Sequence, residues 1–115
     1  MDIEAFREMI ERRIEALNRI SEQSRDSQAP VELDQTRQGR LSRMDAMQGQ
    51  AMARATDERR RHEVARLKAA LTRIDGGEFG ECSECGDPIA GKRLRSDPAA
   101  TLCVDCASAR ERADR

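Results

Sequence analysis

The stretch Cys82-Ser83-Glu84-Cys85 is followed, after seventeen intervening residues, by Cys103-Val104-Asp105-Cys106. Two Cys-x2-Cys pairs at this separation supply four thiolates, which is the ligand set of a closed tetrahedral Zn(II) site. Gly86, directly after the first pair, permits a positive φ that turns backbone N–H groups toward a ligand sulfur. The spacing therefore predicts one structural zinc ion with these ligands: Cys82, Cys85, Cys103 and Cys106.

The same cysteines allow two other interpretations, a disulfide or thioredoxin-like redox pair and a set of unligated thiols. A thioredoxin-like motif would accompany a βαβ pattern, and none is visible in the sequence. The first residues lack a continuous apolar signal segment, and no run of about 18 apolar residues occurs, so we expect a soluble, cytoplasmic protein. A reducing cytoplasm favours zinc over disulfides. Four cysteine ligands leave no coordination position for a catalytic water, which indicates a protein that is not an enzyme.

Upstream of the cysteines, apolar residues recur three and four positions apart, as in amphipathic helices. In the first predicted helix, residues 2–25, they are Ile3, Phe6, Met9, Ile10, Ile14, Leu17 and Ile20. The second, longer helix carries one stripe at Leu41, Met44, Met47, Ala51, Met52 and Ala55 and another at Val64, Leu67, Leu71 and Ile74. Ser42 and Asp45 form a candidate capping box for its start, and Gly76-Gly77 ends it.

The two predicted helices are expected to pair as an antiparallel hairpin, because each apolar stripe needs a partner. We predict a mainly α fold: a helical hairpin or coiled coil over residues 1–76, with its tip at about 26–41, followed by a zinc-finger module with a short C-terminal helix over residues 77–115. Residues 56–63 offer no strong apolar anchor, so the seam there is expected to be thin or bridged by alanine and long side-chain stems, and we expect this waist to be mobile.

Opposite charges are nearly balanced, with 21 Lys plus Arg against 22 Asp plus Glu. Residues 82–115 carry six basic and six acidic side chains and no aromatic ring. Phosphate attraction and base stacking therefore lack their usual residues, and we expect no direct nucleic-acid binding. The basic cluster at residues 92–95 is either a site for one anion or a solvated loop, and His62 is expected to be a surface residue.

The zinc-module sequence resembles a known family. The segments GEFGECSECGDPI at 77–89, Arg93-Leu94 and PAATLCVDC at 98–106 look like the zinc finger of the DksA/TraR family of bacterial transcription regulators, and the preceding hairpin is similar in kind to that family's coiled coil. The resemblance implies a non-enzymatic, monomeric regulator that binds RNA polymerase and not DNA. In that family the coiled coil lies in the polymerase secondary channel, and the protein alters the lifetime of open complexes at particular promoters, often together with the alarmone ppGpp.

The resemblance is weaker at the hairpin tip, where the family carries an Asp-x-x-Asp-x-Ala pattern that is absent between Asp26 and Met47. Asp34 and Asp45, with Ala46 directly after the second acid, are the candidate partner-binding residues. Asp34 is equally suited to form a turn, and Asp45 to cap a helix. The alternative function is a zinc-stabilised adaptor that binds another protein, in which the Met-rich stripe at 44–52 would be a dimerisation or docking seam.

Overall fold

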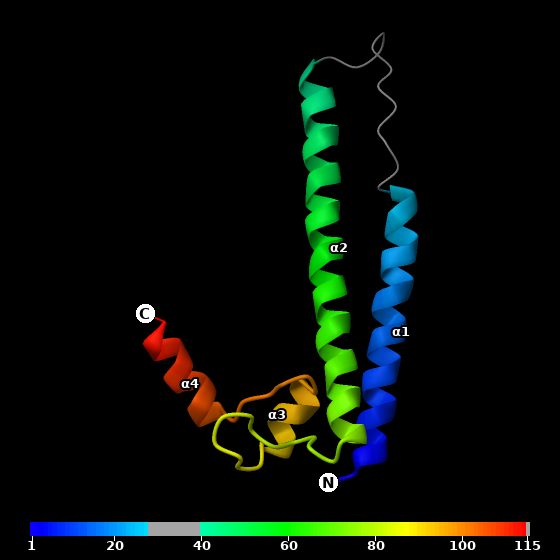
Figure 1. Cartoon of the computed structure of the whole chain (residues 1–115). Helices are drawn as coiled ribbons and strands as arrows, with labels where there is room; N and C mark the ends of the chain where they lie inside the picture. The colour runs from blue at the N-terminus through cyan, green and yellow to red at the C-terminus, as the bar shows by residue number, and fades with distance from the viewer. Residues whose placement is uncertain (28–39, 115) are drawn as a thin grey trace. The chain divides into compact units, whose positions relative to one another are not determined.

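The computed structural model describes residues 1–27 and 40–114, and side chains over 1–24 and 43–114. These residues form four helices and one isolated β-bridge, between Glu81 and Pro88. The helices are α1 (Ile3–Ser27), α2 (Arg40–Asp75), α3 (Gly91–Ser96) and α4 (Val104–Ala113) (Figure 1). The predicted mainly α class is confirmed. Within the described part of the chain, no helix combines the length and the apolar character needed to cross a membrane.

The chain divides into two compact units: residues Met1–Ile14 with Ala65–Arg115, and residues Glu15–Val64. We call them the zinc-end unit and the hairpin unit. In each unit, a segment of α1 lies beside a segment of α2 and runs in the opposite direction (Figure 1). The predicted helical hairpin is therefore confirmed.

The core of the zinc-end unit is built from both helices and the zinc-finger segment. α1 contributes two buried apolar side chains and α2 three, and the remainder follow α2 in the sequence. Asp2 caps the start of α1, because its Oδ1 accepts a hydrogen bond from the Ala5 N–H at 3.1 Å. The buried members are Phe6, Ile10, Leu67, Ala70, Ile74, Phe79, Ile89, Leu94, Pro98, Ala99 and Ala100.

A glycine pair ends α2, as predicted. Gly77 has a φ of +73°, the left-handed conformation that glycine adopts without a steric penalty. The Glu78 N–H donates to the Arg73 carbonyl at 2.9 Å, and the Gly77 N–H donates to the Ile74 carbonyl at 3.1 Å. This pair of bonds is the Schellman arrangement, which satisfies the last carbonyls of the helix and turns the chain toward the first cysteine pair.

In the hairpin unit, the structure overturns the predicted buried face of α2. Met44, Met47 and Met52 are 52%, 57% and 71% exposed, so the Met-rich stripe does not face α1. Among the side chains that the structure describes in this unit, Asp57 and Val64 are buried. Less exposed positions at the same spacing are Ala46, Gln50, Ala53 and Arg60, with Thr56 and Glu63 beside this row. Val64 and Leu67 are buried on one face of α2. Toward the start of the helix, the same face continues at every third or fourth residue, and the methionines do not belong to it.

The predicted start of α2 was also wrong. The helix begins at Arg40, so Ser42 and Asp45 lie inside it and not at its N-cap and third position. The expectation of long side-chain stems within residues 56–63 is confirmed in one case: Arg60 is half-buried and its Nε donates to the Ser21 Oγ of α1 at 3.3 Å.

Candidate metal centre

The first cysteine pair lies on a tight turn between two short extended segments. The Cys82 N–H donates to the Asp87 carbonyl at 2.8 Å, and the Gly86 N–H donates to the Cys82 carbonyl at 2.9 Å. Gly86 has a φ of +78°, as predicted for the glycine directly after the first cysteine pair. The turn holds Cys82 buried, whereas Cys85 is exposed.

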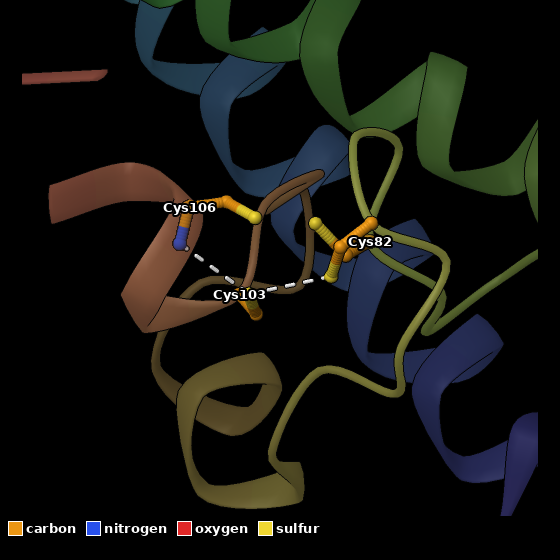
Figure 2. Close-up of side chains that lie close together, drawn as sticks. Cys82, Cys103 and Cys106 are labelled. Atoms are coloured by element: carbon orange, nitrogen blue, oxygen red, sulfur yellow. Dashed lines mark hydrogen bonds between the residues drawn. The ribbon is translucent and has the colours of Figure 1, made fainter. Parts of the chain in front are cut away.

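The second cysteine pair is fixed by the start of α4. Cys103 is the N-cap residue of this helix, and its side chain accepts a hydrogen bond from the Cys106 N–H at 3.5 Å. Because Cys106 is in the first helical turn, its side chain is directed back toward the cap. Figure 2 shows the Cys82, Cys103 and Cys106 side chains converging on one point from these two segments.

The four sulfurs fit a single tetrahedral zinc ion. All four Sγ atoms lie within 4.8 Å of one another, and the Cys85 and Cys103 Sγ atoms are 3.8 Å apart. With Zn–S bonds of about 2.3 Å, the edge of an ideal sulfur tetrahedron is about 3.8 Å. A disulfide requires about 2.05 Å, and all four cysteines are free thiols. The donor set is therefore closed and all-sulfur, which is the arrangement of a structural site.

Before a metal ion binds, the four neighbouring thiols shift one another's pKa values. Hydrogen bonds from the backbone of Cys85, and then from that of Cys103, lower the pKa of Cys82 from 9.0 to about 6. The pKa of Cys106 is raised, first through its side-chain hydrogen bond with Cys103 and then through those with the other thiols. Cys82 therefore loses its proton readily, whereas deprotonation of Cys106 is unfavourable. A divalent cation bound by the sulfurs would stabilise all four thiolates and make that deprotonation favourable.

Arginines hold the loop between the two cysteine pairs, one from within the loop and two from α2. Arg93 Nε donates to the Leu102 carbonyl at 2.9 Å, one residue before Cys103. From α2, Arg66 pairs with Asp97 at 3.1 Å and Arg73 donates to the Ala99 carbonyl at 3.4 Å. Burial lowers the pKa of Arg73, which is the expected effect of removing a cation from water.

Sequence reasoning missed the positioning roles of Arg66 and Arg73, because an arginine that contacts a carboxylate or a backbone carbonyl far along the chain leaves no spacing pattern. Residues 92–95 were expected to be a solvated loop or an anion site. They lie instead in α3, where Leu94 is fully buried and Arg93 is committed to the Leu102 carbonyl. The solvated-loop interpretation is therefore wrong.

The other predicted site residues lie outside the metal centre. Asp34 falls outside the described residues. Asp45 is exposed and Ala46 is half-buried, both in the second turn of α2 in the hairpin unit. His62 is exposed on α2, which confirms its assignment as a surface residue.

Comparison with known proteins identifies the zinc-finger segment. Residues 77–112 match the prokaryotic DksA/TraR C4-type zinc finger. The chain is 35% identical over 65 residues to the RNA polymerase-binding transcription factor DksA of Caulobacter vibrioides, covering 56% of this chain and 46% of that protein. It is 35% identical over 49 residues to the factor of the same name from Escherichia coli, covering 43% of this chain and 32% of that one. These matches span less than half the length of the curated relatives.

The likeness in structure extends over nearly the whole chain. The solved structure of transcription factor DksA2 from Pseudomonas aeruginosa matches with a TM-score of 0.82 and 25% sequence identity, covering 98% of this chain and 85% of that one. The fold and the site thus define a C4 zinc-finger protein built on a helical hairpin. Residues 77–112 thus match the DksA/TraR C4-type zinc finger, and the chain is DksA-like.

Proposed function

We propose that this protein is a DksA-like transcription regulator that binds RNA polymerase and modulates transcription initiation without binding DNA directly. The observation that carries the proposal is the four-cysteine centre, which matches the DksA/TraR zinc finger and belongs to a fold that follows DksA2 over 98% of the chain. Because bacterial RNA polymerase acts in the cytoplasm, the proposal places the protein there. It assigns no catalytic step to the chain.

In this proposal the zinc ion is structural. Cys82 and Cys85 from the first turn, with Cys103 and Cys106 from the start of α4, hold one Zn(II). The ion supplies a cross-link between two segments that share few buried apolar contacts of their own, since α4 has no buried residue. Three arginines, Arg66, Arg73 and Arg93, hold the loop between the two cysteine pairs through its side chains and carbonyls.

The helical hairpin would enter the polymerase secondary channel, and Asp34, Asp45 and Ala46 would be its contact residues. Asp45 is exposed on α2, as a contact residue must be. The near-zero net charge of −1 supports recognition through local contacts, because it provides no general attraction to nucleic acid. The alarmone ppGpp is the proposed co-regulator, and its effect is measured by adding it to a transcription assay with and without this protein.

The test is a pull-down with purified bacterial RNA polymerase core, in competition with an established secondary-channel binder. We expect the protein to bind and the competitor to displace it. The Asp34→Asn/Asp45→Asn double variant should bind more weakly. The control Glu22→Gln/Glu58→Gln makes the same loss of two negative charges at two exposed glutamates and should bind as the wild type does. Absence of binding at micromolar concentrations would contradict the proposal, and binding that the competitor leaves intact would contradict the channel assignment.

A second candidate function rests on the exposed methionines. Met44, Met47 and Met52 place flexible, polarizable apolar side chains on the outside of α2, as surfaces that dock other proteins do. A zinc-stabilised adaptor, or a dimer formed through this face, would use them. Light scattering after size exclusion separates these candidates: the polymerase regulator is expected to be a monomer, and a stable dimer would favour the alternative.

A further inference from the structure

The second cysteine pair is held by contacts to the carbonyls directly before it. The Ser83 N–H, within the first cysteine pair, donates to the Thr101 carbonyl at 2.8 Å. Arg93 Nε donates to the next carbonyl, that of Leu102, at 2.9 Å. The two peptide groups that lead into Cys103 are therefore fixed from two sides, one by the first cysteine pair and one by α3.

The helix α3 is a firm support for the Arg93 side chain. Leu94, the next residue of this helix, is fully buried in the core of the zinc-end unit. The Arg93 carbonyl accepts a hydrogen bond from the Asp97 N–H at 2.8 Å, which closes the end of the helix. Arg93 itself is half-buried, and a hydrogen bond from a guanidinium is stronger than one between two neutral groups. The donor is thus carried by a rigid element and ordered by a strong bond.

The peptide group between Leu102 and Cys103 also contacts a metal ligand. Its carbonyl accepts the bond from Arg93, and its N–H, that of Cys103, is hydrogen-bonded to the Cys82 sulfur. Cys82 belongs to the other cysteine pair and is the buried member of the four. One peptide group therefore connects a cation on α3 with a sulfur of the metal centre.

The planarity of this peptide group makes its two contacts depend on each other. Because the C=O and the N–H lie in one plane, a donor that fixes the direction of the carbonyl also fixes the direction of the N–H. A donor at the carbonyl oxygen also polarises the peptide group, and linked hydrogen bonds strengthen one another. An N–H directed at a sulfur offsets part of the negative charge that four thiolates bring to the metal centre.

We infer that Arg93 is a positioning residue of the metal centre: it holds the Leu102–Cys103 peptide so that the N–H faces the Cys82 sulfur and the two cysteine pairs are aligned for one zinc ion. Without the guanidinium, the peptide group can turn and the Cys82 sulfur loses a donor, so zinc binding must itself order this segment. Residues that orient metal ligands account for about 10- to 100-fold in metal affinity. The inference concerns the retention of zinc and does not depend on polymerase binding.

The test compares two replacements of Arg93 that carry the same charge. Arg93→Met keeps an unbranched side chain and removes the donor. Arg93→Gln is also neutral, but its amide nitrogen follows the δ-carbon, as Nε does in arginine, so a donor remains at that position. Lys92→Met is the control, because it removes one exposed positive charge from the neighbouring residue of the same helix.

Zinc affinity is measured on the whole chain by competition with a chelator at a fixed pH. We expect Arg93→Met to bind zinc about 10- to 100-fold more weakly than the wild type, and Lys92→Met to match the wild type within about twofold. Arg93→Gln should lie between them, because a neutral donor makes a weaker bond to the Leu102 carbonyl than a guanidinium does.

A second measurement separates positioning from a general loosening of the zinc-finger segment. Cobalt(II) can take the place of zinc among four thiolates, and it absorbs light through charge transfer from their sulfurs. A thiolate that loses an N–H donor gives up electrons more easily, so the charge-transfer band of Arg93→Met should move to longer wavelength. The band of Lys92→Met should stay in place. Loss of packing alone would lower the affinity without moving the band of the bound ion.

The inference requires both changes. If Arg93→Met matches Lys92→Met in either zinc affinity or the position of the cobalt band, the inference is overturned. If Arg93→Met does not fold with zinc, Arg93→Gln is compared with Lys92→Met in its place. Weaker zinc binding together with a displaced band then supports the inference, and equality in either measurement overturns it.

Discussion

Phe6 and Phe79 pack against each other, with ring centroids 5.3 Å apart and ring planes inclined by 53°. They are the only aromatic residues of the chain, and they lie 73 positions apart in the sequence. The contact joins the second turn of α1 to the segment that leads into the first cysteine pair. Tilted aromatic pairs contribute about 1 kcal/mol beyond the area that they bury.

Replacement of Phe79 by alanine is expected to lower the free energy of unfolding by about 3 kcal/mol or more, because a buried ring is lost and a cavity remains. Urea denaturation followed by circular dichroism measures the change. Ile20→Ala is the matched control, since Ile20 is 46% exposed and its truncation should cost much less. Equal losses in the two variants would contradict the packing described for the zinc-end unit.

Cys85→Ser should abolish stoichiometric zinc binding and unfold the segments around the two cysteine pairs, because three thiolates and a hydroxyl no longer complete the tetrahedral site. Zinc content by plasma mass spectrometry and the melting temperature report the two effects. Ser83→Ala, two residues away in the same turn, should retain both wild-type values. A Cys85→Ser protein with full zinc and wild-type melting would contradict a four-cysteine structural site.

Zinc binding should release protons and weaken as the pH falls. The raised pKa values of Cys85 and Cys106 keep these thiols protonated near neutrality, so at least two protons leave for each zinc bound. The pKa of Cys82 is lowered from 9.0 to about 6, so its contribution to metal-free stability is complete above pH 9 and is lost as the pH falls through 6.

Calorimetric titration with zinc in two buffers of different ionisation enthalpy counts the released protons. We expect at least two at pH 7.5 and an apparent affinity that increases with pH from 6 to 8. A proton count near zero at pH 7.5, or an affinity independent of pH over this interval, would contradict this description of the thiols.

The exposed Met-rich face leads to a prediction about stability. Met44→Lys/Met47→Lys should change the free energy of unfolding by less than about 0.5 kcal/mol, because both side chains are more than half exposed. Val64→Ala, at a buried position of the same helix, should cost clearly more. Thermal melting compares the two variants. A larger loss of stability in the methionine variant would show that these methionines pack against the other helix.

The metal centre was predictable from sequence because its geometry depends on four residues at fixed spacing. The end of α2 was predictable for a similar reason, since Gly77 is required at a left-handed position. The buried face of the first half of α2 was not. Two stripes compete there at helical spacing, and the more hydrophobic one, Met44 to Ala55, faces solvent.

The burial of Asp57 between the helices of the hairpin unit was missed because this residue is charged. Asp57 and Arg60 have the composition of a solvated surface, and a pattern search places such residues outside. Their burial depends on each other and on Ser21, which lies 39 positions from Arg60. The hydropathy pattern of α2 alone does not predict this burial, because the hydrogen-bond partner of Arg60 lies on α1.

The sulfur of Cys103 has two roles: it belongs to the metal centre, and it caps α4. α4 is ten residues long and has no buried side chain, and helices of that length rarely persist by themselves in water. Its nucleation is therefore provided by the cysteine cluster, supported by the ion pair between Arg110 and Glu84. The helical structure of this last segment therefore depends on four sulfurs, although the helix itself contains only one of them.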